Sequence, residues 1–590
     1  MDNNRERLHH SLPALDIEYL PETRHKPQKE KKGRQLEDEE LTYISSAFYS
    51  KILVIIGIAF SITRSITTEG NIQHDIFYIY LYVGSTTFLA YMYMIHTRTR
   101  SLMTEIFSYN NQSNGSNETI DSYKQKLYVR YGSFYFRMGV VGFGVGSLIY
   151  STFKFGQYFE FNSSDGSCVG VLRAIKPATR IAFILLQMLF IFSFSNFIAV
   201  QKSQLIAKFG LMHLIATNVS DWFQVVVEQT VHDLNNTVMT YSRHHNSTMK
   251  DLRIDEYDSR LLNIMRLKHV QEKSCQKLNL ITPILMKIEP HLASCAVEYN
   301  LLCTMILLLM WKISTSQKKK EASRDLSTEI SRQSGSNAIY GRSQSQFSVD
   351  CAQTQRGLFS GILVLAVTII SLIVFFEFVP YDDKKDVALL QMMIWESIIF
   401  FISIVAVLMS AMTLRDLKIS NTNIELPLEH LLLLVTQSGM FIYCLFQIIS
   451  GCLMRSRVGM AKVFGILTPT LGVLQSCCQT TFILDARRRC CSTEDQIKRK
   501  PGRQLITFLL LLNVSLWVIN RIKNNRSIFH PRQMDFYGIL AWNIITHVSN
   551  PLIVSYRFQA TVCFYEIWKH VYKRPIKRSL NEDMRLENHS

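Results

Sequence analysis

The sequence lacks the short motifs that mark several classes of enzyme and channel. It contains no nucleotide-binding loop of the form GxxxxGK[ST], no HExxH, no GxSxG and no TVGYG potassium filter. These motifs hold phosphate, zinc, a nucleophilic serine or a dehydrated potassium ion, so ATP-driven pumping, hydrolysis and potassium selectivity lack support. We therefore expect neither an enzyme nor a bound cofactor.

Charge is also scarce, and cysteine follows no metal-binding pattern. Only 19% of the 590 residues are charged, whereas 48% are hydrophobic. The net charge is +17, but the basic residues cluster at the ends of apolar runs, so we expect no nucleic-acid partner. The twelve cysteines show no CxxC pairs or Cys/His spacing, so no metal site is predicted. Cys168 and Cys275 can pair if both are extracellular.

Long apolar runs predict a polytopic membrane protein. About 20 apolar residues suffice to cross roughly 30 Å of hydrocarbon as a helix. We predict twelve such spans, at residues 41–63, 76–97, 134–156, 179–200, 206–229, 290–311, 357–379, 387–413, 427–450, 463–484, 504–521 and 535–571. No short apolar segment with a cleavage site precedes the first span, so we expect no cleavable signal peptide.

The placement of basic residues predicts the orientation of these spans. Lys202 and Lys208, together with the basic runs at 318–320, 487–489 and 569–578, fall in alternate connections. The positive-inside rule places these connections and both termini in the cytosol. The glycosylation sequons in the segment 230–289 agree with this orientation, whereas those near residues 111–117 and the basic loop 521–534 do not.

The chain divides into two membrane domains. We predict a cytosolic tail at 1–40, a six-helix membrane domain at 41–311, a disordered cytosolic linker at 312–356, a second six-helix membrane domain at 357–572 and a cytosolic tail at 573–590.

Short words shared by the two domains suggest an internal duplication. GSLIY at 146–150 matches GMFIY at 439–443, and NVSDW at 218–222 matches NVSLW at 513–517. The matches fall in corresponding spans and in the same order. Because six spans is an even number, the copies enter the membrane in the same direction, as parallel repeats. The predicted fold is an all-α bundle of twelve transmembrane helices in two parallel six-helix repeats, although accidental likeness between aromatic-rich helices is the alternative.

Polar residues inside the apolar spans form stripes. The last span carries Asn543, His547, Asn550 and Arg557, which lie within about 40° of one direction at about 100° per residue. Pro551 is expected to kink this helix. A charged side chain in the middle of a bilayer costs at least about 2.5 kcal/mol, so such residues normally face a protein interior or a water-filled cavity.

Three other spans carry similar stripes. Their members are His213, Thr217, Ser220 and Gln224 on the fifth span, His291, Ser294 and Glu298 on the sixth, and Glu396, Ser403 and Ser410 on the eighth. A hydrogen bond to a neighbouring helix is the alternative explanation for any single stripe. The four stripes together predict a hydrated interior that protons can enter.

The residue types suggest separate roles. Histidine and carboxylate side chains can exchange protons near neutral pH, whereas Arg557 acts through its charge or extends to the cytosolic interface. A second group of histidines lies in the predicted extracellular segment: His232, His244, His245 and His269. These can sense acid or bind zinc, or they can belong to a solvated loop.

The sequence resembles the otopetrin family of proton channels. The resemblance rests on GVGSLIYS, FGLMHLIATNVSDWF, CAVEYNL, WESIIFF and the long C-terminal FYGILAWNIITHVSNPLIVSYRFQATVCFYEIWKHVYK. It implies two barrel-like halves, a homodimer with sterol in its central space, inhibition by zinc, and entry of protons across the plasma membrane when the outside turns acidic. The family motifs VEY, WES, ITH and YRF fall on Glu298, Glu396, His547 and Arg557.

We therefore predict a proton-selective channel. The predicted proton pathway comprises Glu298, Glu396, His547, Asn543, Arg557, His213 and Gln224. The pathway can follow either barrel or the interface between the halves. A proton-coupled secondary transporter is the alternative, because parallel repeats and charged residues at mid-membrane suit it as well.

Overall fold

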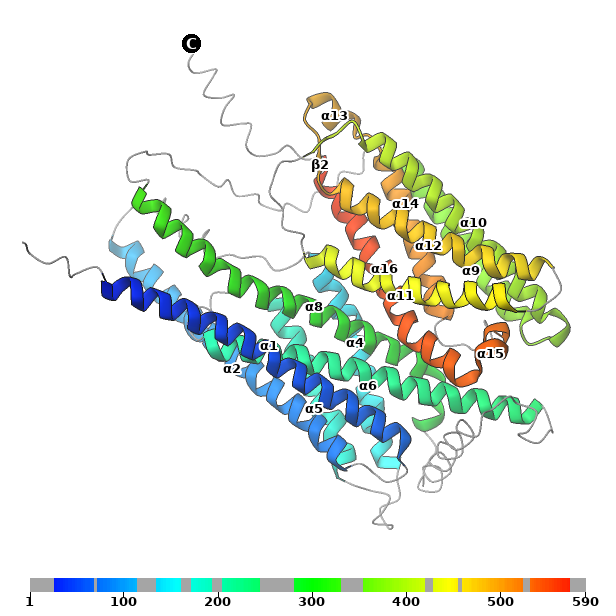
Figure 1. Cartoon of the computed structure of the whole chain (residues 1–590), viewed down its shortest axis with the longest axis horizontal. Coiled ribbons are helices and arrows are strands. Elements are labelled where there is room, and N and C mark those ends of the chain that lie inside the picture. The colour runs from blue at the N-terminus through cyan, green and yellow to red at the C-terminus, as the bar shows by residue number, and fades with distance from the viewer. Residues whose placement is uncertain are drawn as a thin grey trace, which may run out of the picture.

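The computed structural model describes residues 26–67, 72–113, 134–160, 171–193, 204–244, 281–330, 354–419, 428–454, 459–523 and 531–572. Within these ranges the chain is nearly all helical (Figure 1). Cys168 and Cys275 lie outside the described residues, so their pairing stays a prediction.

The long helices follow the predicted spans. Those before residue 331 are α1 (Lys26–Ile66), α2 (Ile72–Ser113), α4 (Phe134–Gly156), α5 (Leu172–Ser193), α6 (Gln204–His244) and α8 (Ile281–Ile330), with the 3-10 turn η1 (Gln157–Glu160) after α4. Those after it are α9 (Gln355–Phe378), α10 (Asp382–Leu414), α11 (Leu428–Leu453), α12 (Met460–Ala486), α14 (Arg503–Lys523) and α16 (Ile539–His570). Two short helices, α13 (Glu494–Arg499) and α15 (Pro531–Tyr537), lie between them.

Some boundaries differ from the sequence prediction. α4 has the predicted bounds, but α6 continues past residue 229 and α8 continues to Ile330, into the segment predicted as a disordered linker. The run of lysines at 318–320, with Glu321 and Ala322, has favourable helix propensity even where no apolar face is present. α16 continues through Pro551 as a single helix.

The helices have the composition of membrane spans. Among the described residues, nine helices are long and apolar enough to cross a membrane: α1, α4, α5, α8, α9, α10, α11, α12 and α14. α6 and α16 do not meet this test because many polar side chains interrupt their apolar runs, and those side chains are largely buried against neighbouring helices. The polar residues of this bundle therefore lie inside it.

The outer surface of the bundle is apolar. α9 has a mean hydropathy of 2.8 across its most apolar window, yet only 28% of that window is buried inside the protein. Phe359, Leu363 and Ile373 on this helix are each more than half exposed. An apolar surface of this extent is typical of contact with lipid, so the protein is an all-α, multi-pass membrane protein.

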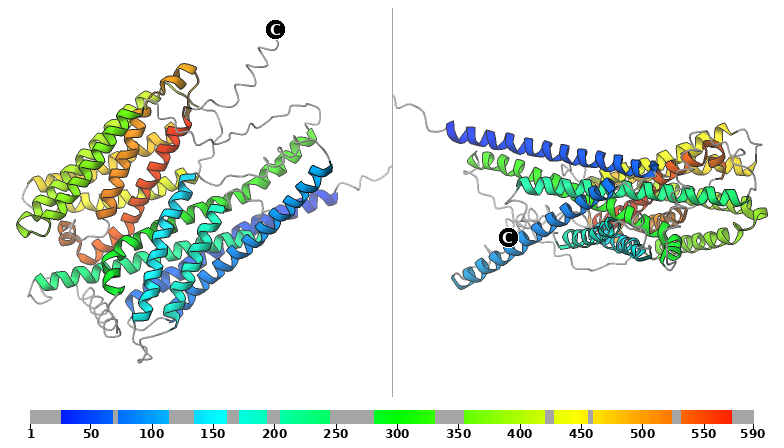
Figure 2. Two further views of the ribbon diagram at one scale, coloured as in Figure 1. Left: turned by 180° about the vertical axis from the view of Figure 1, so that it is seen from behind. Right: turned by 90° about the horizontal axis from the view of Figure 1, so that it is seen from below.

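Helix packing follows the same order in the two parts of the chain. In the first part α6 packs on α1 and α8, α4 packs on α5 and α8, and α2 packs on α5. In the second part α14 packs on α9 and α16, α11 packs on α12 and α16, and α10 packs on α12. The two halves lie side by side (Figures 1 and 2), and they meet where α16 packs against α6 and α8 and α11 packs against α8.

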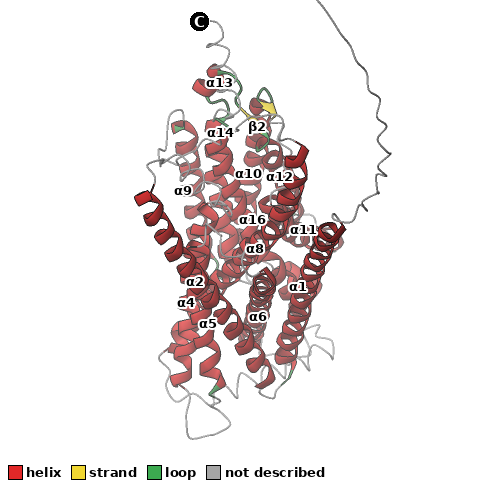
Figure 3. Ribbon diagram, turned by 90° about the vertical axis from the view of Figure 1, so that its left-hand side faces the viewer, coloured by secondary structure: helices red, strands yellow, loops and turns green. Residues whose placement is uncertain are grey.

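A small polar layer closes one end of the second half (Figure 3). The strands β1 (Lys418–Ile419) and β2 (Arg489–Cys490) pair antiparallel there, beside α13. Arg489 donates to the main-chain oxygen of Arg415 at 2.8 Å and forms an ion pair with Asp485 at 2.7 Å. The hydrogen bond to Arg415 satisfies a carbonyl group at the end of α10 that has no partner within the helix.

Two glycines allow α9 to approach α14 closely. A Cβ atom at Gly357 would lie 2.0 Å from the main-chain oxygen of Gln504, and one at Gly361 would lie 2.5 Å from Leu511 Cδ1. The two glycines are four residues apart, so they share a face of α9, the spacing of small residues found in many membrane helix pairs. Any side chain at Gly357 must push the helices apart.

We predict that Gly357→Val destabilises the protein, because its new side chain meets backbone that cannot move aside. The cost of such overpacking is typically about 1–3 kcal/mol. Gly142→Val is the matched control, because Gly142 is also within a helix and a Cβ atom added there would meet no other atom within 4 Å. Thermal denaturation of the detergent-purified protein, followed by size-exclusion chromatography, measures both. Equal melting temperatures for the two variants would contradict the packing described here.

Candidate functional site

A carboxylate is buried where the two halves meet. Glu298 on α8 has no exposed surface, and its Oε2 accepts a hydrogen bond from the Ser555 hydroxyl of α16. Its other oxygen, Oε1, has no hydrogen-bond partner among the described residues. A buried carboxylate with one free oxygen is costly unless it binds a proton or water, so this position is a candidate for proton transfer.

The hydrogen bond between Glu298 and Ser555 joins similar sequences. Glu298 lies between Val297 and Tyr299, while Ser555 lies between Val554 and Tyr556. α8 and α16 hold the same place in the packing order of the two halves. The contact therefore links positions that correspond in the two halves.

A histidine–aspartate cluster joins the halves at a second place. His547 Nε2 of α16 lies 3.1 Å from Asp233 Oδ2 of α6, and His232 Nδ1 lies 3.5 Å from Asp233 Oδ1. His232 and Asp233 follow the predicted span 206–229. Burial alone would raise the pKa of Asp233, but hydrogen bonds from His232 and His547 hold that pKa below its ordinary value. The hydrogen bond to Asp233 raises the pKa of His232.

Sequence reasoning found two members of this cluster and missed the one that joins them. Asp233 lies next to His232 in the sequence, but only the continuation of α6 beyond residue 229 brings it to α16. Asn543 is buried one turn of α16 before His547, and its Nδ2 has no partner among the described residues. Gln224 points elsewhere, because its Nε2 donates to Glu228 at 2.7 Å.

The other predicted histidines are placed only in part. The backbone of His244 belongs to α6, whereas His245 and His269 lie outside the described residues. In the part of the chain that the structure describes, no group of three or more His, Cys, Asp or Glu side chains could hold a metal ion. A zinc-binding role for these histidines stays a prediction.

Arg557 lies inside the second half, together with neutral amides. It is completely buried and donates from Nη1 to Gln475 Oε1 at 2.7 Å, so it does not extend to the cytosolic interface. Gln475 donates onward to Gln479 at 2.7 Å, and Gln479 exchanges hydrogen bonds with Asn513 at 3.0 and 2.9 Å. Arg557 and His547 therefore share a stripe on α16, but Arg557 contacts α12 within the second half whereas His547 contacts α6 of the first half.

The first half has a matching amide pair and an additional ionic group. Gln187 on α5 donates to Asn218 on α6 at 3.1 Å, as Gln479 on α12 does to Asn513 on α14. Beside it, Asp221 accepts from Arg180 at 2.8 Å, Tyr82 at 2.5 Å and Asn300 at 2.6 Å. Asp221 was not among the sequence candidates, although an aspartate inside an apolar span is itself a signal.

His213 has both ring nitrogens engaged. Nδ1 lies 3.0 Å from the Tyr49 hydroxyl, and Nε2 lies 3.1 Å from the main-chain oxygen of Leu81. The Tyr49 hydroxyl is in turn 3.1 Å from that of Tyr80. These neutral partners join α1, α2 and α6, so His213 contributes to helix packing whatever else it does.

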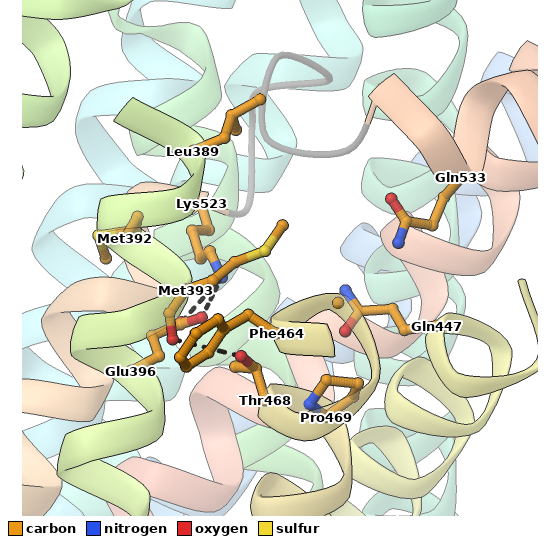
Figure 4. Close-up of a pocket in the computed structure, with 11 residues that line it drawn as sticks. Leu389, Met392, Met393, Glu396, Gln447, Phe464, Thr468, Pro469, Lys523 and Gln533 are labelled. Carbon is orange, nitrogen blue, oxygen red and sulfur yellow. Dashed lines mark hydrogen bonds and ion pairs between the residues drawn. The ribbon is translucent and has the colours of Figure 1, made fainter. Parts of the chain in front are cut away.

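Glu396 lines a cavity in the second half (Figure 4). Its two carboxylate oxygens accept from Lys523 Nζ at 2.8 and 2.7 Å. The empty space at this site, open solvent included, is about 410 Å³, and Gln447, Thr468 and Gln533 also line it. Lys523 was missed because the sequence offered no reason to pair the end of α14 with the middle of α10.

The first half also carries, at one end, a group of charged side chains that were not among the sequence candidates. Asp75 lies 2.7 Å from Arg64, 3.0 Å from His74 and 3.4 Å from Lys176. These residues lie at the ends of α1, α2 and α5. Hydropathy places them at the edges of predicted spans, where charge is ordinary, so no functional signal separated them from other flanking residues.

Comparison with known proteins identifies the family. The Otopetrin family model matches residues 135–558. The chain is 35% identical to Proton channel OtopLc of Drosophila melanogaster over 95% of its own length, and it spans 37% of the length of that relative. It is 24% identical to Proton channel OTOP2 of Mus musculus over 74% of this chain and 82% of the relative. It is 18% identical to Proton channel OTOP1 of Danio rerio over 75% of this chain and 79% of the relative. The chain belongs to the otopetrin family.

Proposed function

We propose that this protein is a proton-selective channel that carries protons across the plasma membrane down their electrochemical gradient and opens when the outside is acidified. Membership of a family whose relatives are named proton channels supports this function. The observation that carries it is Glu298, a fully buried carboxylate between the halves with one oxygen free to receive a proton. Such a group can accept and release protons where a larger ion has no hydrated bore.

The proposed architecture is twelve transmembrane helices in two parallel six-helix repeats, within the domain bounds 41–311 and 357–572. The matched packing order and the two equivalent Gln–Asn pairs support it. α2, α6 and α16 then cross the membrane as well, shielded by more apolar neighbours. Both ends of the chain lie on the cytosolic side in this arrangement, as the basic connections predict. The homodimer and the sterol implied by the family resemblance stay predictions.

The interface between the halves is our preferred proton route. Its outer part is the cluster of His232, Asp233 and His547, and its middle is Glu298 with Ser555. His547 precedes Ser555 by eight residues on α16, which corresponds to about 12 Å along the helix. Side chains cannot exchange a proton directly over that distance, so the route requires water between them.

The interiors of the two halves are less suitable as main routes. In the second half, Glu396 is neutralised by Lys523, and the interior beyond it holds the Arg557 guanidinium among neutral amides. Among the described residues no carboxylate oxygen in this interior is free to accept a proton, whereas Glu298 Oε1 is free at the interface. In the first half, Asp221 already accepts four hydrogen bonds, two from Arg180 and one each from Tyr82 and Asn300, so it has little capacity for another.

The first test is electrical recording from cells that express the full chain. We expect an inward current when the outside is acidified, with a reversal potential that moves by about 59 mV per pH unit of gradient, as a one-charge carrier requires. Mock-transfected cells are the control. A reversal potential that follows sodium or chloride would reject the function, and saturable uptake of a solute would favour a proton-coupled transporter.

The second test compares the two carboxylates. Glu298→Gln preserves size but cannot carry a proton in the same way, so we expect it to reduce the current by about tenfold or more, equivalent to about 1.4 kcal/mol in the barrier. Glu396→Gln is the matched variant in the second half and should cause the smaller loss. Currents are normalised to surface protein measured by biotinylation. The opposite order of the two losses would move the main route into the second half.

The third test concerns the outer cluster. The carboxylate of Asp233 raises the pKa of His232, so Asp233→Asn makes protonation of His232 harder. If this protonation opens the channel, half-maximal current should require a more acidic outside solution in that variant. Asp233→Glu retains the charge and is the control. A pH dependence that is the same in all three proteins would separate this cluster from activation.

A further inference from the structure

An arginine reaches from the second half into the interface beside Glu298. Arg521 lies in the last turn of α14, and its Nη2 donates to the main-chain oxygen of His291 at 2.6 Å and to Cys295 Sγ at 3.4 Å. Both acceptors belong to α8, in the other half. Its Nη1 is buried without a hydrogen-bond partner among the described residues. One nitrogen of this guanidinium is therefore free to donate a further hydrogen bond.

The guanidinium lies about one helical turn from the buried carboxylate. Cys295 precedes Glu298 by three residues, so their side chains lie on the same face of α8, about 4.5 Å apart along the axis. Arg521 also interacts electrostatically with both Cys295 and Glu298. A free Nη1 donor and a free Oε1 acceptor thus occupy one buried region without being joined to each other.

Other charged groups on the helices packed against α8 are already engaged. Those groups are Asp221 with Arg180 towards α6, Lys154 with Glu289 towards α4, His547 with Asp233 towards α16, and Arg557 with Gln475 within the second half. Arg521 differs from Arg180 and Lys154 because the acceptors of its Nη2 are a carbonyl oxygen and a thiol, neither of which neutralises its charge. Arg557 also donates only to a neutral amide, but its guanidinium lies within the second half. The field of Arg521 therefore acts on Glu298 with little compensation.

We propose that Arg521 is a positioning residue for proton transfer, which sets the proton affinity of Glu298 from across the boundary between the halves. A fixed cation stabilises the ionised carboxylate, so Glu298 binds a proton only when the outside solution is more acidic. It does not itself carry the proton, because a guanidinium stays protonated at any physiological pH. The proposal rests on the proton conduction proposed above.

The experiment measures the pH dependence of the proton current in the full chain. Arg521→Gln should shift half-maximal current to a less acidic outside pH by about one unit, the size expected for loss of about 1.4 kcal/mol of interaction. Arg521→Lys keeps the charge and should restore most of the original dependence. In a Glu298→Gln background, the Arg521→Gln shift should disappear, because the residue through which it acts is gone.

A neighbouring lysine provides the matched control. Lys523 lies two residues further along α14 but pairs with Glu396 in the second half. Lys523→Gln removes the same charge from the same helix end, and it should leave the pH dependence closer to that of the unaltered protein than Arg521→Gln does. An equal shift in both variants would show a general effect of positive charge at this end of α14 and would overturn the proposal.

Chemical modification of a cysteine variant tests the same role in a channel that has already folded and assembled. Arg521→Cys can be treated at the cell surface with a cationic methanethiosulfonate, which places a positive charge at this position in an assembled channel. The treatment should return the pH dependence of the current towards that of the unaltered protein. The unaltered protein is treated in parallel as a control, because it has exposed cysteines of its own, Cys452 and Cys477. No return, or a shift that persists in the Glu298→Gln background, would overturn the role of Arg521. Absence of proton current in the unaltered protein would instead overturn the proposed function.

Discussion

An ionisable side chain inside this bundle must find its partner within the protein, because hydrocarbon cannot solvate charge. The described structure meets this constraint mostly by pairing, as with Asp221 and Arg180, or Glu396 and Lys523. Glu298 is treated differently, since a hydroxyl is its hydrogen-bond partner and one oxygen is free. The same constraint that fixes the other charges therefore makes this carboxylate the group most ready to change its protonation state.

The constraint also accounts for the order of the helices. The helices that carry most of the buried polar groups, α6 and α16, are too polar to qualify as membrane spans on hydropathy alone. They pack against each other and against more apolar neighbours, such as α1, α8, α11 and α14. Polar residues thus collect where the halves meet and inside each half, while α9 presents its apolar surface outward.

Much of this arrangement was available from the sequence, and the remainder depends on long-range contacts. Apolar length predicted the bounds of α4, and the cost of burying charge correctly predicted that Glu298 lies inside the protein. For Arg557 the sequence left an extension to the cytosolic interface open, and its complete burial excludes that alternative. The partners could not be predicted, because Lys523 meets Glu396 only through the packing of α14 on α10. Asp233 was missed for a related reason, since falling hydropathy after residue 229 gives no sign that α6 continues towards α16.

The hydrogen bond between Glu298 and Ser555 has a consequence for how two similar halves can share one molecule. Perfectly identical copies would bring two glutamates face to face at this point, and their mutual repulsion in a dry environment would prevent both from ionising. A serine on one side removes that conflict and leaves a single acid at the contact between α8 and α16. In the repeat architecture proposed above, a difference between the two halves at one position is thus what allows their interface to hold a titratable group.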